Sequence, residues 1–195
     1  MKELVFLLEE ESAKAMLEGL LPRVLDSRVH PRLMTFDGKQ DLEKQMVKRM
    51  RGYLNPHARF IVLRDQDSTP ECKVVKAKLL GLCAQAGRDA VSLVRIACRE
   101  LESFYLADLR AVETAFGVTG LVHQQNTARF RAADRVGSPS RELAKLTHGA
   151  YQKVSGSRQL GPHLDIANDR SASFKNLIAG VRRMEQELLA LPDTH

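Results

Sequence analysis

The sequence predicts an α/β protein with a parallel sheet of about four strands flanked by helices, followed by a mainly helical C-terminal extension. Short apolar segments rich in strand-forming residues alternate with amphipathic segments of about a dozen residues. This alternation ends near Gly117, where the chain becomes more polar and richer in Gly and Ser. Because parallel strands need a long crossover between them, usually a helix, the alternation favours parallel pairing. We expect the α/β domain over residues 1–116 and the helical extension, packed on it, over residues 117–195.

The first two strand–helix units occupy the N-terminal quarter of the chain. Leu4–Leu8 is a continuous apolar run typical of a buried strand, and residues 13–21 then place apolar side chains at helical spacing. Residues 33–36 predict a second, weaker strand that ends at an Asp-Gly turn signal. Residues 41–53 repeat the helical spacing, so a second helix is expected there.

Two further units complete the predicted sheet. Residues 60–63 predict a buried strand and residues 74–86 an amphipathic helix, and residues 91–98 predict a fourth strand that runs into a helix-like stretch. In the extension, Ser138-Pro139-Ser140 predicts a helix start with an N-terminal cap and a first-turn proline. The last predicted helix spans residues 171–189.

Composition restricts the cellular context. The chain has 195 residues, enough for one sizeable core, and its 30 Lys and Arg against 24 Asp and Glu give a net charge of +6. The apolar run Leu4–Leu8 is too short for a signal-peptide core or a membrane span. Cys72, Cys83 and Cys98 are odd in number and widely spaced, which fits neither a disulfide framework nor a structural zinc site. We therefore expect a cytoplasmic protein without membrane insertion.

Acidic residues follow three of the predicted strands. Glu9 follows the first strand, Asp65 and Asp67 follow the third, and Glu100 and Glu102 follow the fourth. Ligands of parallel α/β sheets bind at the carboxyl ends of the strands, so these side chains are expected to gather at one edge. Clustered carboxylates repel one another unless a proton or a cation intervenes, and oxygen ligands select magnesium, manganese or calcium. The pattern predicts a magnesium-type site.

Each acidic segment also has a structural interpretation. Glu9–Glu11 suits the first turn of a helix, where acidic side chains favour the helix dipole. Asp65 and Asp67 suit a polar loop or a helix cap, and Glu100 and Glu102 suit an exposed helix start. Their shared position after separate strands favours a functional acidic cluster.

Several segments carry a resemblance to a known family. An apolar strand followed by Glu9 and Ser12, with a later strand that ends in Asp65-Gln66-Asp67, resembles the Toprim domain of topoisomerases, primases and OLD-type nucleases; that domain usually has Gly where this chain has Glu10. Segments 8–12, 64–68, 98–106 and 151–156 together resemble a Toprim-like bacterial family, a domain of unknown function, over nearly the whole chain. Members of that family are often encoded beside an AAA or SMC-like ATPase. Residues 99–106 also resemble a segment of Toprim-like effectors of phage defence.

The resemblance implies roles for individual residues. Glu9 matches the Toprim glutamate, Asp65 and Asp67 match its aspartate pair, and Glu102 matches the later acidic position of nuclease-like members. Lys153, in the Tyr-x-Lys-x-Ser-Gly stretch, is the best candidate for a cation that neutralises a phosphate, although a loop lysine is more often only solvated.

Other polar residues match less well. Glu100, as a further metal ligand, and Asp108 are weaker correspondences. His163 and Asp165 border the site in one interpretation, but an ordinary cap or loop role is favoured for both.

The resulting hypothesis is a metal-dependent nuclease that uses Mg²⁺ or Mn²⁺ and acts in an ATPase-linked bacterial defence system. A net charge of +6 is modest for a nucleic-acid surface, so an AAA or SMC-like ATPase is expected to assist substrate capture. The alternative is a non-catalytic Toprim-like subunit that docks on such an ATPase. A topoisomerase is disfavoured because the chain is too short for strand-gating domains, and a phosphoryl-transfer receiver or haloacid-type hydrolase because Glu9 stands where an Asp is needed.

Overall fold

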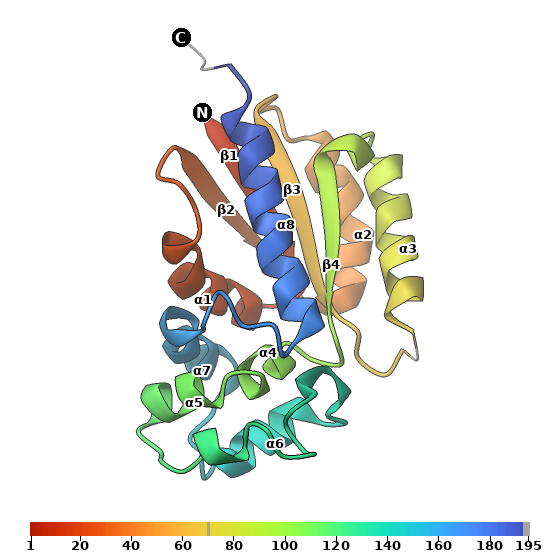
Figure 1. Ribbon diagram of the computed structural model, residues 1–195. Helices are drawn as coiled ribbons and strands as arrows, with labels where there is room; N and C mark the ends of the chain where they lie inside the picture. Colours follow the sequence, from red (N-terminus) through yellow and green to blue (C-terminus); the bar gives the residue numbers. More distant parts are fainter. Residues whose placement is uncertain (70, 193–195) are drawn as a thin grey trace.

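The computed structural model describes residues 1–69 and 71–192, so the last three residues of the predicted extension lie outside it. Its centre is a four-stranded, wholly parallel sheet in the order β2-β1-β3-β4 (Figure 1). The strands are β1 (Lys2–Leu8), β2 (Val29–Thr35), β3 (Ala58–Asp65) and β4 (Ser92–Ala97). The predicted α/β class with a parallel sheet, flanking helices and a helical C-terminal region is confirmed.

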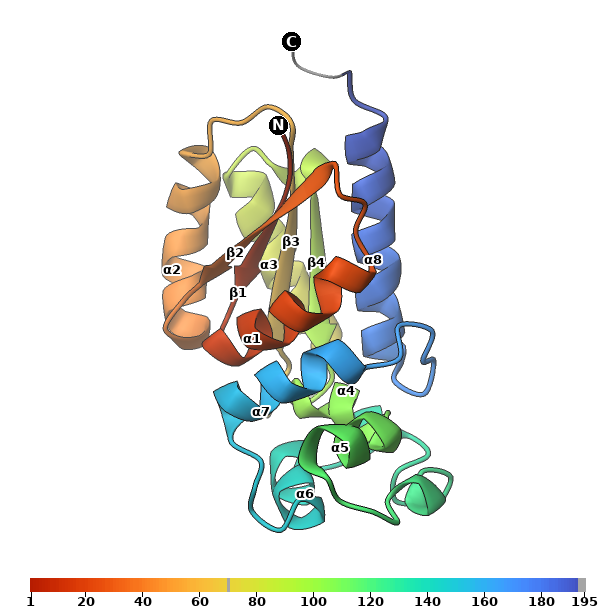
Figure 2. The ribbon, with the colours of Figure 1, turned by 90° about the vertical axis from the view of Figure 1, so that its left-hand side faces the viewer.

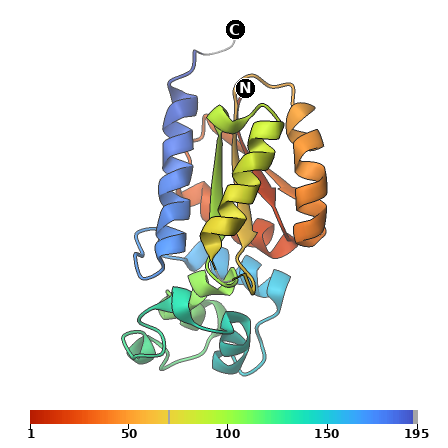
Figure 3. The same cartoon turned by 90° about the vertical axis from the view of Figure 1, so that its right-hand side faces the viewer.

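Helices cover both faces of the sheet and one end of it. Helices α1 (Glu11–Leu20) and α8 (Ala172–Leu189) contribute to the core on one face, and α2 (Gly38–Arg51) and α3 (Cys72–Gln85) pack on the other (Figures 2 and 3). Beyond the carboxyl ends of the strands lie α4 (Glu102–Leu106), α5 (Leu109–Phe116), α6 (Pro139–Leu146) and α7 (Lys153–Leu160). Short 3₁₀ turns occupy Leu21–Arg23, Asp89–Val91, Val122–Gln124, Ala133–Arg135 and Gly161–His163.

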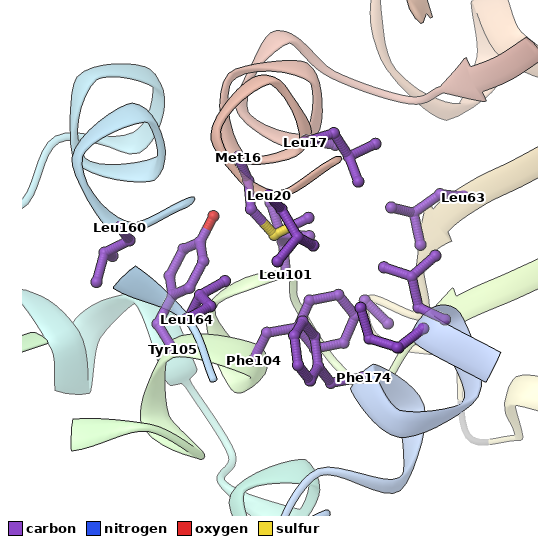
Figure 4. Packing of buried hydrophobic residues seen from close by; sticks show 14 of the residues in the cluster. Met16, Leu17, Leu20, Leu63, Leu101, Phe104, Tyr105, Leu160, Leu164 and Phe174 are labelled. Atoms are coloured by element: carbon purple, nitrogen blue, oxygen red, sulfur yellow. The ribbon is translucent and has the colours of Figure 1, made fainter. Parts of the chain in front are cut away.

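Burial on both faces explains the continuous apolar run of β1. Leu4, Phe6 and Leu8 belong to the core beneath α1 and α8, whereas Val5 and Leu7 belong to the core beneath α2 and α3. Side chains alternate between the two faces of a strand, so a strand covered on both sides needs apolar residues at every position. Figure 4 shows the first of these cores close to the carboxyl end of β3, where residues of α1, α4, α7 and α8 meet.

Strand β2 begins at Val29, four residues before the predicted start. It lies at an edge of the sheet, and most of its first half is exposed. Pro31 lacks a backbone donor, which an edge strand tolerates. The segment therefore lacks the apolar signature on which a sequence-based assignment depends.

One helix boundary and one helix cap also differ from expectation. The helix-like stretch after β4 is divided into α4 and α5 at Asp108, whose carboxylate accepts a hydrogen bond from the Ala111 N–H (3.1 Å) and caps α5. Ser138 precedes α6 as predicted but makes no capping bond through its side chain. The Glu100 carboxylate accepts from the Ser140 N–H instead (2.8 Å).

The last helix returns to the sheet after the helices at its carboxyl end. Ser171 caps α8 by accepting from the Phe174 N–H (3.0 Å), at the predicted start of this helix. Phe174, Leu177 and Val181 are fully or almost fully buried in the core formed with the strands. The Lys2 ammonium donates to the Leu189 carbonyl (3.2 Å), so the first strand and the last helix are also joined by a hydrogen bond. Segments distant in sequence therefore share one core.

Glycine permits a close approach between α1 and the turn that follows α7. A Cβ at Gly161 would lie 2.3 Å from the Met16 carbonyl oxygen, whereas a Cβ at Gly81, within α3, would meet nothing within 4 Å. We expect Gly161→Ala to lower the free energy of unfolding by about 2 kcal/mol through overpacking. Gly81→Ala should raise it by about 0.5–1 kcal/mol, because alanine is the better helix former. Urea denaturation of both variants checks this; equal stability of the two would contradict the proposed packing constraint.

Candidate functional site

The strand order places the ends of β1 and β3 at the switch point of the sheet. The connection after β1 leads to β2 at one edge, and the connections after β2 and β3 build the sheet in the other direction. Ligands of open α/β sheets bind in the crevice at such a point. Here Glu9 directly follows β1 and Asp65 ends β3, and the Asp65 N–H donates to the Glu9 carboxylate (3.0 Å).

A cavity of about 340 Å³ opens beside this point. It collects side chains from the end of β3, the loop between β4 and α4, the first turn of α6 and the start of α7. Its lining residues include five that the sequence singled out: Asp65, Asp67, Glu100, Glu102 and Lys153. Glu9 does not line this cavity; it lies in a small adjoining recess that also contains Asp65.

Glu102 is the most deeply buried carboxylate of the site, with 1% of its surface exposed. One of its oxygens, Oε1, accepts a hydrogen bond from the Tyr151 hydroxyl (2.7 Å). The other, Oε2, is buried and finds no hydrogen-bond partner among residues 1–69 and 71–192. A buried carboxylate oxygen without a donor is costly, so this atom is the clearest sign of a missing ligand or proton.

The stretch Tyr151–Gly156 holds this arrangement together. The Tyr151 ring packs edge-on against Tyr105 and Phe116, with ring centroids 6.2 Å apart in each case. A Cβ at Gly156 would lie 2.4 Å from the Tyr151 ring, so only glycine leaves room for it. The spacing of Tyr, Lys and Gly in this stretch therefore has a structural cause.

Burial and nearby negative charges raise the pKa values of the three inner carboxylates, Glu9, Asp65 and Glu102. Burial raises the pKa of Asp65 well above its usual range, and the negative charges of Glu102 and Glu9 raise it further. Burial also raises the pKa of Glu102, against the hydrogen bond from Tyr151. For Glu9, burial again raises the pKa, opposed by the hydrogen bond from the Asp65 N–H. Without a cation, burial thus disfavours the ionised form of each of these carboxyls.

Two positive side chains lie near these acids. The Arg64 guanidinium is 3.9 Å from the Glu9 carboxylate, and Lys153 lines the acidic cavity. Lys153 forms an ion pair with Glu10, and Glu10 also accepts a hydrogen bond from Ser12 (3.3 Å). Burial acts to lower the pKa of Lys153, but the hydrogen bond and charge of Glu10, with the charges of Glu102 and Asp65, raise it overall. Lys153 is therefore charged while facing the acidic cavity.

The outer carboxylates already have partners. Asp67 forms an ion pair with Lys39 (3.0 Å), and its N–H donates to the Arg99 carbonyl (2.8 Å). Asp67 and Arg99 both adopt left-handed backbone conformations, with φ of 57° and 64°. Strained residues of this kind gather at functional sites. Glu100 holds the start of α6 through Ser140, so one of its oxygens already has a structural role.

Three predicted peripheral residues lie elsewhere. Asp108, His163 and Asp165 line a separate cavity of about 440 Å³. Asp108 caps α5 and also accepts from the Asp165 N–H (2.7 Å), so its carboxylate is satisfied within the fold. These residues do not join the acidic cavity.

Sequence reasoning missed Tyr151 and Glu10. Tyr151 belongs to the Tyr-x-Lys stretch, but its contact with Glu102 spans 49 positions. The signal available was its place two residues before Lys153. Glu10 stands where the Toprim pattern has Gly, and its pairing with Lys153 gives that position a role.

The side chains of the acidic cavity and its adjoining recess have the chemistry that a divalent cation requires. Glu9, Asp65 and Glu102 offer only oxygen donors, and Glu102 has an oxygen without a partner. Within the described residues, no three His, Cys, Asp or Glu side chains form a ready-made ligand group. Binding a cation would therefore require side-chain adjustment.

Comparison with known protein families identifies the family of the chain. A family model for a domain of unknown function, DUF4276, matches residues 8–182. The chain belongs to the DUF4276 family. The expectation of a domain of unknown function is confirmed, whereas the relation of this DUF4276 chain to Toprim and OLD-type nucleases stays a prediction.

The other comparisons add no relative for this DUF4276 chain. No curated protein and no solved structure matches it. Within the part of the chain that the structure describes, no helix combines the length and hydropathy needed to cross a membrane.

The pKa of Asp65 leads to a prediction for the metal-free DUF4276 protein. Because the pKa is higher in the folded than in the unfolded state, ionising Asp65 costs folding free energy, and stability is lost as pH rises through the folded-state pKa. Asp65→Asn removes this cost, so it should stabilise the protein at high pH and lose that advantage at low pH. Urea denaturation in EDTA between about pH 4 and pH 8 measures it. A stability difference that shrinks with rising pH would contradict the repulsion described above.

Proposed function

We propose that the acidic cavity hydrolyses phosphodiester bonds with a bound Mg²⁺ or Mn²⁺. The observation that carries the proposal is the buried, partnerless Oε2 atom of Glu102 in a cavity shared with Asp65 and Lys153. A hard cation would satisfy this oxygen and relieve the repulsion between the carboxylates. A bound cation and a nearby positive side chain both stabilise the charge that develops as a phosphodiester is hydrolysed. This site offers ligands for the cation and supplies the positive side chain, Lys153.

Each residue has a distinct task in this proposal. Glu9, Asp65 and Glu102 hold the cation, and Tyr151 fixes the rotamer of Glu102 through its hydroxyl. Bound divalent cations stabilise the charge that develops on phosphoryl oxygens. Lys153 binds a non-bridging phosphate oxygen, for which it exchanges its ion pair with Glu10. A water oxygen then bonds to phosphorus as the bond to the leaving oxygen breaks. The water gives up one proton and the leaving oxygen takes one up from solvent, so no protein nucleophile is needed.

The biological setting in the proposal rests on resemblance. Residues 99–106 resemble a segment of Toprim-like phage-defence effectors, and the Toprim-like family resembled by the chain is often encoded beside AAA or SMC-like ATPases. We therefore propose a nuclease-type effector with such an ATPase as partner and with DNA or RNA as substrate.

One observation favours the alternative of a non-catalytic docking subunit. Lys153 is paired with Glu10 and Lys39 with Asp67, so two carboxylates near the cavity are already neutralised within the chain. In a docking subunit these ion pairs would serve stability alone. A docking subunit could also hold a metal for structural reasons, so the two functions differ in whether the site cleaves.

Metal binding is the first test. Millimolar Mg²⁺ or Mn²⁺ should raise the melting temperature, because a ligand at about 100 times its Kd adds about 2.7 kcal/mol to the stability of the folded state. Glu102→Gln should abolish most of this shift by removing the buried ligand. Glu18→Gln, an exposed change on α1, should retain it. Differential scanning calorimetry measures the shifts; identical shifts in the two variants would place the metal elsewhere.

Cleavage is the second test. Glu9→Gln, Asp65→Asn and Glu102→Gln should each reduce Mn²⁺-dependent cleavage about 100-fold or more, because a lost ligand misplaces the reacting groups. Lys153→Met should reduce it by about 100-fold, typical of one lost transition-state donor. Labelled DNA and RNA are incubated with and without an AAA or SMC-like ATPase of the proposed kind, with Glu18→Gln as control. Full cleavage by Asp65→Asn would contradict the proposed mechanism and favour the docking function.

A further inference from the structure

Positive charge is concentrated on one face of the sheet. Helices α2 and α3 together carry eight basic and two acidic side chains, a net charge of +6. Helices α1 and α8, which contribute to the core on the opposite face, carry four basic and four acidic side chains. The whole chain also has a net charge of +6, so its excess equals that of α2 and α3. Figure 3 shows these two helices side by side on one side of the sheet.

Several of these cations are exposed and form no ion pair within the described residues. Lys44 and Lys48 stand one turn apart on the outer side of α2, and Lys73 and Lys76 stand one turn apart on α3. Across residues 1–69 and 71–192, none of the four forms an ion pair, unlike Lys78, which pairs with Glu43 (2.6 Å). Uncompensated cations on adjacent helices repel one another, so their gathering favours an anionic partner.

The face formed by α2 and α3, which we call the basic face, begins next to the acidic cavity. Both helices follow strands, so their N-termini lie at the carboxyl edge of the sheet, and the Gly38 N–H donates to the Glu9 carbonyl (3.0 Å). A second depression, of about 450 Å³, contains Lys39 and Arg99 together with Asp67 and Glu100. The last two residues also line the acidic cavity, so the two hollows adjoin.

We propose that the face formed by α2 and α3, the basic face, binds the phosphodiester backbone of a nucleic acid and leads it to the acidic cavity. The delivery to the cavity rests on the proposed function; the binding does not. Spaced lysines without an aromatic platform suit contacts to phosphates rather than to bases, so binding is independent of sequence and weakened by salt. Val74 and Leu80 are the large apolar side chains exposed on these two helices, too few for insertion into a membrane.

Binding is tested apart from cleavage by fluorescence anisotropy in EDTA. The fourfold variant Lys44→Gln/Lys48→Gln/Lys73→Gln/Lys76→Gln is compared with Lys14→Gln/Lys175→Gln/Arg182→Gln/Arg183→Gln on α1 and α8. Both lose four positive charges, so they share a net charge of +2. The basic-face variant should bind labelled DNA and RNA at least about 10-fold more weakly, with a shallower dependence of log K on log salt, because each lost phosphate contact removes about 0.7–0.9 from that slope. The control should bind within about 2-fold of the wild type.

The outcomes separate this inference from the proposed function. Equal weakening in both variants would overturn it, because net charge alone would explain binding. So would basic-face-dependent binding to vesicles of anionic phospholipid with no binding to nucleic acid. If the basic-face variant loses binding while no protein cleaves, the inference stands and the nuclease proposal fails. If cleavage is found and the basic-face variant binds and cleaves normally, the nuclease proposal stands and the inference about the basic face fails. Circular dichroism of both variants confirms that they are folded.

Discussion

The burial of Glu102 beside Asp65 is the constraint on which the site depends. A carboxylate that is 1% exposed needs compensation, and this chain supplies part of it through two side chains. Tyr151 donates to one oxygen, Lys153 supplies a nearby positive charge, and the second oxygen remains for a ligand or a proton. The helices beyond the sheet are arranged to meet this need, because α7 begins at Lys153 and is held against α1 through the close contact at Gly161.

The return of α8 to the sheet completes this arrangement. Residues between β4 and α8 form the helices over the carboxyl end of the sheet, and α8 then fills the same core as β1 and β3. Both ends of this helical segment are thus fixed to the sheet. The segment can hold Tyr151 and Lys153 in place without a core of its own, because Tyr105, Leu160 and Phe174 belong to the core that includes Leu4 and Leu63.

The sequence was sufficient for the sheet and for the inner carboxylates. Strands covered on both faces, such as β1, are apolar throughout, and a carboxylate directly after a strand reaches the carboxyl edge by topology alone. Glu9 and Asp65 were therefore predictable, whereas Glu102 lies in α4 beyond the loop after β4 and was indicated by the family resemblance. Strand β2 was only partly predictable because an exposed edge strand has no apolar period. Tyr151 and Glu10 were not predictable as site residues, since their contacts with Glu102 and Lys153 depend on how distant helices pack.

For attracting a polyanion to the acidic cavity, the distribution of positive charge on the surface matters more than the total net charge. Electrostatic attraction between exposed charges is screened over about 8 Å at physiological ionic strength, so an even spread of positive charge would do little at one edge of the sheet. An acidic cavity also repels a polyanion, and a nucleic acid would approach it only if attraction acted close by. Lys39 lies at the rim of the cavity, and the lysines of α2 and α3 continue away from it. A protein of modest net charge can in this way attract a polyanion to the neighbourhood of its carboxylates while reserving the carboxylates themselves for a cation.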